Sequence, residues 1–228
     1  MIKQRTKEWY ASRIGKFTAS GFSNLMAKPR DKSATWSRSA LNYIEKAAAQ
    51  LYYNDYYARP DNDSTRWGMI HEDSAIKEFS RQLPGVIEEA GFMEHPEINC
   101  IGATPDAFFI NDLEERTVVQ VKCPYNQKNH QKYIEKISNG HSLRKSKSEY
   151  FWQIQGEIWI TGADFGYFVS FDPRITGDDR LHYVKVGRDE VAIDELEYTV
   201  LKSLEKRDEI LQQFRIGTRY PKELFEYW

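Results

Sequence analysis

Two short apolar segments joined by a polar turn constrain the fold of this chain more than any other feature. The segments are 107–110 and 117–122, and both are rich in the β-branched and aromatic residues that favour strands. The residues between them, 111–115, read Asn-Asp-Leu-Glu-Glu and are typical of a turn. The pattern therefore predicts a β-hairpin, with Asp106 immediately before its first strand.

Three polar side chains should meet on this hairpin. Strand residues two apart project from the same face, so Gln120 and Lys122 point the same way, and Asp106 can reach them from across the hairpin. Oxygens of Asp106 and Gln120, together with the backbone oxygen of Val121, suit a hard divalent cation. A lysine beside such an ion can orient or deprotonate an attacking water and balance phosphate charge. The spacing is that of the metal-dependent nuclease pattern Pro-Asp…(Asp/Glu)-x-Lys, with neutral Gln120 in the place of the second acid.

Two predicted helices offer further candidates for the same site. Glu72 is a third carboxylate on one helix, and its neighbour Asp73 should face away from it by about 100°. Gln153 and Gln155 lie on an otherwise apolar helix, where buried amides need hydrogen-bond partners. These amides either complete a polar network in the core or position the metal-bound carboxylate and the phosphate. Taken singly, Asp106 could be a turn residue and Glu72 a solvated acid, so it is their combination that indicates a site.

The basic residues are concentrated in two segments, although the formal net charge is only −2. Residues 1–46 contain ten lysines and arginines against three acids, and residues 122–148 contain seven against one. Such segments could line a groove or channel that holds nucleic acid. Each could equally be a solvated basic surface.

The bulk properties favour one folded domain over residues 1–228, since 40% of the residues are hydrophobic and 14% are aromatic. No apolar run reaches membrane-spanning length, and the first residues lack the apolar core of a secretory signal. Two cysteines do not suggest a disulfide framework, so we expect a reduced, cytoplasmic setting without a membrane partner. The sequence also has no nucleotide-binding loop, which argues against an ATP-driven motor.

Helical and strand patterns alternate along the chain and predict an α/β fold of the α+β kind, with helices flanking a mixed central β-sheet. We expect helices at 6–13, 18–28, 37–52, 64–82, 126–137, 149–161 and 189–214, and strands at 86–94, 99–103, 107–110, 117–122, 167–171 and 181–186. The stretch 52–63 is expected to be an exposed loop, and Asn139-Gly140 to interrupt the helical pattern. In the helix at 64–82, the residues expected to face inward are Trp67, Ile70, Ala75, Ile76 and Phe79.

Blocks of residues, in order along nearly the whole chain, resemble the lambda-type (YqaJ-like) viral alkaline exonucleases. This family lies within the restriction-endonuclease-like PD-(D/E)xK nuclease superfamily, so the resemblance implies a restriction-endonuclease-like core. The ordered set is far more specific than the Asp-Lys motif alone. The blocks are Trp9–Ser20, Ala27–Arg30, Trp67–Glu72, Thr104–Asp106, Val119–Pro124, Tyr150–Gln155 and Phe171–Arg174.

The resemblance implies a Mg²⁺-dependent exonuclease, with Mn²⁺ as a substitute, that digests one strand of linear double-stranded DNA from 5′ to 3′. The remaining 3′ single-stranded overhang would be passed to a single-strand annealing protein in phage recombination. The resemblance also implies a homotrimeric ring with the DNA running through a central channel. The two basic segments could then face this channel.

The resemblance implies roles for individual residues as well. The metal would be held at Asp106 and position 120. The water would be assisted by Lys122, and the active site would be completed by Glu72 and Gln153. The terminal 5′-phosphate would be held by Arg13 and Ser20, and an arginine suits this role because its fork binds phosphate bidentately.

The departure from the family pattern is Gln120, where the pattern has Glu. One explanation is a natural variant that binds metal through its amide oxygen with lower affinity. The other is an isosteric Glu→Gln change made to trap uncut DNA, which the otherwise intact motif favours. In either case we expect weak or no nuclease activity from this chain. The alternatives are a non-catalytic module that binds DNA ends and an endonuclease with the same core.

Overall fold

A mixed β-sheet lies at the centre of the molecule. The computed structural model describes residues 2, 4–55 and 62–221, and within them this sheet has five strands in the order β2-β5-β6-β7-β8. Strands β6 and β7 run parallel, and the other neighbouring strands are antiparallel, as the sequence predicts for a mixed sheet. The strand bounds are Gly85–Glu89 (β2), Ala107–Asn111 (β5), Arg116–Lys122 (β6), Phe165–Phe171 (β7) and Leu181–Gly187 (β8).

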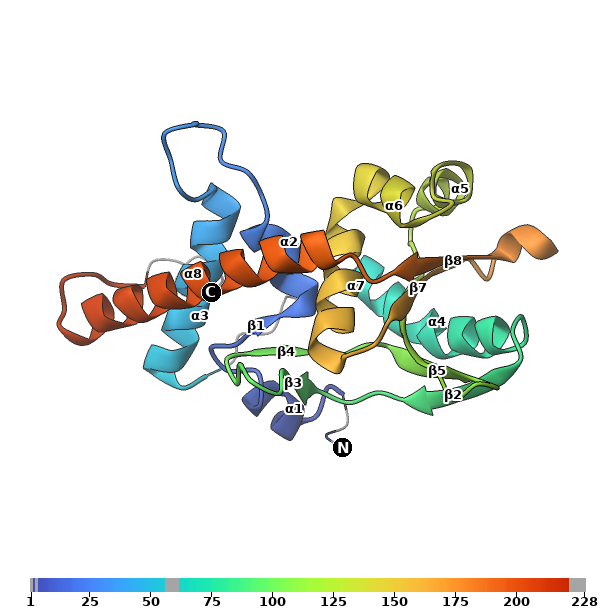
Figure 1. Ribbon diagram of the computed structural model, residues 1–228, viewed down its shortest axis with the longest axis horizontal. Helices are drawn as coiled ribbons and strands as arrows, with labels where there is room; N and C mark the ends of the chain where they lie inside the picture. Colours follow the sequence, from blue (N-terminus) through green and yellow to red (C-terminus); the bar gives the residue numbers. More distant parts are fainter. Residues whose placement is uncertain (1, 3, 56–61, 222–228) are drawn as a thin grey trace.

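Helices cover both faces of this sheet (Figure 1), which confirms the predicted α/β fold. Helix α7 (Ser148–Thr161) packs on one face, in a core that includes Val118 of β6. Helix α4 (Asp63–Ser80) packs on the other face, in a core that includes Val119 and Val121. Because side chains alternate along a strand, Gln120 projects with Val118 toward α7.

A smaller sheet of three strands lies beside the first in the described residues, in the order β1-β4-β3. Its strands are Phe17–Thr18 (β1), Ile101–Ala103 (β4) and Met93–Glu94 (β3). The prediction of one strand over 86–94 is therefore wrong, because β2 and β3 belong to different sheets. Ala90 and Phe92, between the two strands, are buried, so the apolar pattern continues through the change of sheet and conceals it.

The remaining helices follow the sequence pattern with local differences. Figure 1 shows α8 extending along the long axis of the molecule, with α3 packed against it. Asn139-Gly140 does not merely end a helix: the Asn139 side chain caps a further helix, α6, which the sequence reading missed. The segment predicted as one helix at 18–28 forms a 3₁₀ turn and one short helix. The bounds are Lys7–Ala11 (α1), Ala19–Gly21 (η1), Phe22–Leu25 (α2), Arg38–Tyr53 (α3), Gln127–Lys136 (α5), Gly140–Ser146 (α6), Asp178–Arg180 (η2) and Glu190–Arg215 (α8).

Helix α4 and the segment before it differ from two expectations. Ile70 is 68% exposed, so the prediction that it faces inward is wrong. It lies nine residues before the buried Phe79, and at about 100° per residue this places the two on opposite sides of the helix. Half of the loop expected at 52–63, residues 56–61, lies outside the described residues, and its first residues, Tyr52 and Tyr53, belong to α3. None of the helices in the described residues has the length and apolar character needed to cross a membrane.

Candidate active site

Asp106, Gln120, Gln153 and Lys122 form one hydrogen-bonded chain. The Gln120 amide nitrogen donates to Asp106 Oδ2, and the Gln120 oxygen accepts from the Gln153 amide nitrogen. Lys122 Nζ donates to the Gln153 oxygen over 3.3 Å. The structure thus brings Gln120 and Lys122 to one side of β6 near Asp106, as the strand alternation predicts, and adds Gln153 from α7.

The hairpin fixes the position of Asp106. Its backbone N–H donates to Val119 O over 3.0 Å, and its Oδ2 accepts from the backbone N–H of Val121 over 2.7 Å. Burial raises the pKa of this carboxyl to about 7, and the negative charge of Glu72 adds to the effect, while Lys122 opposes it. The surroundings of Asp106 therefore disfavour its ionised form, although Lys122 offsets part of this effect.

The oxygens around Gln120 fit a small divalent cation in type and direction. The Gln120 amide nitrogen lies 3.4 Å from Val121 O and also donates to Asp106, so both oxygens converge on one positively polarised group. Carboxylate, carbonyl and amide oxygens are the ligand types that Mg²⁺ and Mn²⁺ accept. The donor set is short of charge, however, since the described residues contain no cluster of three or more Asp, Glu, His or Cys side chains suited to a metal.

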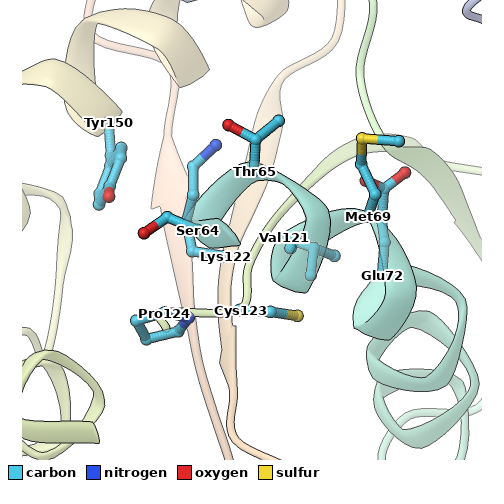
Figure 2. Close-up of a pocket in the computed structure, with 10 residues that line it drawn as sticks. Ser64, Thr65, Met69, Glu72, Val121, Lys122, Cys123, Pro124 and Tyr150 are labelled. Atoms are coloured by element: carbon cyan, nitrogen blue, oxygen red, sulfur yellow. The ribbon is translucent and has the colours of Figure 1, made fainter. Parts of the chain in front are cut away.

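A cleft of about 260 Å³ opens beside this chain of side chains, between β6, α4 and the beginning of α7. Figure 2 shows Lys122 between α4, which carries Glu72, and the ring of Tyr150. Lys122 Nζ lies 5.1 Å from the centre of that ring. The lysine therefore faces the space that a substrate could enter, whereas Gln120 is only 2% exposed and lies beneath it.

The N-terminal segment contacts the same site, which the sequence reading missed. Arg5 forms a 2.8 Å ion pair with Glu72, the third carboxylate candidate. Gln4 donates to the backbone oxygen of Pro105 over 3.1 Å. Arg5 also has a positive φ of 66°, an uncommon conformation for a residue other than glycine. No local pattern in the sequence indicates this contact, since it joins residues 67 positions apart.

Arg13 and Ser20, the candidates for 5′-phosphate binding, belong to one polar group. Arg13 lies over the ring of Trp9, 4.0 Å from its centre, and donates to Thr104 Oγ1 over 3.3 Å. It also donates to Thr18 Oγ1 over 3.4 Å, and that hydroxyl lies 3.3 Å from Ser20 Oγ. Thr104 is two residues before Asp106, so the backbone links this group directly to the hairpin site.

The two amides of α7 have different roles. Gln155 donates to Gly187 O over 2.8 Å and accepts from Asp189 N over 3.0 Å, so it connects the end of β8 to the cap of α8. Gln153 instead joins the hairpin site and donates to Glu157 Oε1 over 3.0 Å. Glu157 is fully buried, and burial followed by the negative charge of Asp106 holds its pKa well above the usual range. The sequence reading missed Glu157, although its spacing of four residues from Gln153 on an apolar helix was a usable signal.

The block Phe171–Arg174 supports the strand end that carries Lys122. Arg174 donates to both oxygens of the buried Asp172. It also donates to the backbone oxygens of Pro124 and Tyr125, over 3.2 and 3.0 Å. This clamp fixes the segment that immediately follows Lys122.

Comparison with known proteins agrees with this architecture. Residues 8–164 match the family described as the YqaJ-like viral recombinase domain. The structure is similar to that of the alkaline exonuclease LHK-Exo from Laribacter hongkongensis, with 27% identity, a TM-score of 0.79, and 93% of this chain and 98% of that chain covered. A complex of LHK-Exo with dAMP gives 28% identity and the same TM-score of 0.79. A phage-related exonuclease from Haemophilus somnus 129PT shares the fold, with 17% identity, a TM-score of 0.69, and 87% and 96% of the two chains covered.

Part of the chain also resembles a curated bacterial protein. Over 67 residues it is 37% identical to the protein ExoD of Escherichia coli (strain K12), covering 29% of this chain and 76% of that protein. The family match spans more than half of the chain, and the similarity to LHK-Exo extends over nearly all of it. The chain therefore belongs to the YqaJ-like viral recombinase family and has the fold of an alkaline exonuclease.

Proposed function

We propose that this protein is built as a Mg²⁺-dependent exonuclease, with Mn²⁺ as a substitute, that digests one strand of linear double-stranded DNA from 5′ to 3′. The remaining 3′ overhang would serve recombination by single-strand annealing. The observation that carries the proposal is the hydrogen-bonded arrangement of Asp106, position 120, Lys122 and Gln153 in an alkaline exonuclease fold, with Lys122 lining a cleft. The substrate would be met in the cytoplasm of a bacterium or a phage-infected host.

Each side chain has a defined part in phosphodiester hydrolysis. Asp106 and the Val121 carbonyl would hold the cation, and the Gln120 oxygen would join them once its amide, whose nitrogen faces them here, is turned over. A bound cation neutralises phosphate charge and makes a water more acidic. Lys122 orients the attacking water and balances charge on the phosphate, because its ammonium faces the cleft. Gln153 fixes Lys122 and position 120 relative to one another through its amide. Glu72 adds a carboxylate on the opposite wall of the cleft.

The 5′ polarity is supported by the polar group around Arg13. Its guanidinium and the Ser20 hydroxyl could bind a terminal phosphate, and Thr104 connects them to Asp106. A site that binds a DNA end beside the reacting phosphate favours an exonuclease over an endonuclease with the same core. The crystallised complex of LHK-Exo with dAMP is compatible with exonuclease action, since digestion from a DNA end releases mononucleotides.

Gln120 should nevertheless leave this chain with weak or no activity. Its amide nitrogen donates to the oxygens of Asp106 and Val121 that a cation would need, and an amide brings no negative charge of its own. The same observation favours a second candidate function, a module that binds DNA ends without cutting them.

One experiment tests both candidates. Linear duplex DNA with 5′-phosphates and closed circular DNA are incubated with Mg²⁺ and either this chain or its Gln120→Glu form. Digestion of linear DNA alone by the Gln120→Glu form supports the exonuclease, and cutting of the circles points to the endonuclease. If neither form digests DNA although both bind its ends, the end-binding module is the better account.

The proposed partners are other copies of the chain and a single-strand annealing protein. A homotrimeric ring would surround the DNA and turn basic segments toward it. Sedimentation equilibrium measures the subunit number directly, and a monomer at all concentrations would exclude the ring.

A further inference from the structure

Glu157 is a buried acid that the proposed roles leave unexplained. Its side chain is fully buried in α7, and Oε1 accepts a hydrogen bond of 3.0 Å from Gln153 Nε2. Its other oxygen, Oε2, has no hydrogen-bond partner anywhere in the described part of the chain. A buried carboxyl oxygen without a partner is costly, and buried acids in proteins are normally paired or bind a metal.

The position of this carboxyl connects it to the candidate cation site. The nitrogen that donates to Glu157 Oε1 also donates to the Gln120 oxygen, so one amide group separates Glu157 from position 120. Gln153 and Glu157 are one helical turn apart and share a face of α7. Asp106 belongs to the same chain of hydrogen bonds, because the Gln120 nitrogen donates to its Oδ2.

We propose that Glu157 is a further acidic residue of the cation site and supplies the negative charge that position 120 lacks. This inference rests on the proposed metal-dependent function and adds a residue to it. A divalent cation held by one carboxylate and the neutral oxygens of Gln120 and Val121 would leave an excess positive charge in a buried place. The Glu157 carboxylate offsets that charge. Mg²⁺ keeps several waters in protein sites, so Glu157 can act by accepting from such a water as well as by direct contact.

The competing account is purely structural. In it Glu157 stays neutral and only orients Gln153 through Oε1. An isosteric amide separates the two accounts, because Glu157→Gln keeps the size and an oxygen acceptor while removing the possible charge.

Cation binding without DNA is the direct test. Mn²⁺ is titrated into the protein and into its Glu157→Gln form by calorimetry, with Glu149→Gln as the control. Glu149 lies in the first turn of the same helix but is exposed, so its loss should leave the affinity unchanged. We expect Glu157→Gln to weaken Mn²⁺ binding at least tenfold. Equal affinities for the unchanged protein and Glu157→Gln overturn the proposal.

The same change in the Gln120→Glu background tests whether Glu157 replaces the missing charge. Position 120 then carries a carboxylate, so Glu157→Gln should weaken Mn²⁺ binding less than it does in the unchanged chain. If Glu157→Gln lowers the Mn²⁺ affinity equally with Gln120 and with Glu at that position, Glu157 does not supply the charge that position 120 lacks. If neither this chain nor its Gln120→Glu form binds Mn²⁺, the inference about Glu157 fails together with the proposed function. If Mn²⁺ binds and Glu157→Gln leaves its affinity unchanged, only the inference about Glu157 fails.

A second measurement needs no substitution at Glu157 and so does not depend on how that variant folds. Crystals of the unchanged protein are soaked in MnCl₂, and the ion is located by its anomalous scattering. An ion contacted by a Glu157 oxygen, or by a water on that oxygen, supports the proposal. An ion held beside Asp106 while Glu157 contacts Gln153 alone overturns it.

Discussion

Position 120 shows how a single amide changes what the surrounding oxygens can hold. The Gln120 nitrogen donates to Asp106 and lies within reach of Val121 O, so the protein itself satisfies oxygens that would otherwise favour a cation. A glutamate has no hydrogen to donate when ionised and would place a second negative charge beside Asp106. If the proposed cation site exists, the amide would favour the protein without metal, and a carboxylate would favour the metal-bound form.

The first prediction concerns the stability of the Gln120→Glu form. Without metal it should unfold more easily, by on the order of 3 kcal/mol, because a buried charge is left without compensation. Excess Mg²⁺ should restore much of this loss, since a ligand that binds only the folded state stabilises it. Urea unfolding in EDTA and in MgCl₂ measures both effects. Gln131→Glu, on the exposed surface of α5, is the control, and its free energy of unfolding should match that of the unchanged protein both in EDTA and in MgCl₂.

The second prediction concerns pH. Because the pKa of Asp106 is raised from 3.8 to about 7, the folded protein keeps a proton that the unfolded chain loses near pH 4. The free energy of unfolding in EDTA should therefore fall as pH rises from about 4 to about 7, by on the order of 1–2 kcal/mol for a partly exposed carboxyl. Glu157 also has a raised pKa and contributes in the same direction, so Asp106→Asn should reduce this dependence rather than remove it, whereas Asp112→Asn, at an exposed turn, should leave it unchanged. A dependence as steep in Asp106→Asn as in the unchanged protein would assign the effect to other groups.

At the scale of elements, the sequence predicted what depends on local periodicity. The two-residue repeat of β6 placed Gln120 and Lys122 on one face, and the turn at 111–115 set the hairpin that brings Asp106 to them. What depends on packing between distant segments was not predictable in this way. The contact of Arg5 with Glu72 and the transfer of the chain between two sheets after β2 both belong to this class. Glu157 combines both kinds of feature. Its spacing of four residues from Gln153 can be found in the sequence, but its burial depends on how α7 packs on the sheet.

The third prediction concerns the close packing of α7. A methyl group on Gly156 would overlap the ring of Phe22 in α2, so this glycine lets the two helices approach. Gly156→Ala should destabilise the protein by about 1–3 kcal/mol through overpacking. Gly68→Ala is the matched control on α4, where an added methyl meets no atom within 4 Å. That change should be neutral or slightly stabilising, because alanine favours a helix more than glycine does. Equal thermal stability of the two variants would contradict the close approach.

At the scale of the whole molecule, the arrangement of charge matters more than its sum of −2. Exposed lysines recur at four-residue intervals along α5, at Lys128, Lys132 and Lys136, and so form a stripe on one side of the helix. None of the three forms an ion pair within the described residues. Lysines of α8 differ, since Lys202 and Lys206 pair with acids of their own helix over 2.9 and 2.8 Å. Helix α5 begins five residues after Lys122 along the chain, so we expect this stripe to help guide DNA toward the cleft.

The fourth prediction compares the lysines of α5 with the paired lysines of α8. Replacing Lys128, Lys132 and Lys136 with alanine should weaken binding of duplex DNA and make it less dependent on salt. Affinity falls as salt rises, and each lost phosphate contact makes the plot of log affinity against log salt less steep by about 0.9. Lys202→Ala with Lys206→Ala removes charges that are already paired and should leave the slope nearly unchanged. Fluorescence anisotropy of a labelled duplex over a series of salt concentrations measures both variants. If the α5 variant keeps the original slope, its lysines are a solvated surface, and the DNA path lies over another part of the molecule.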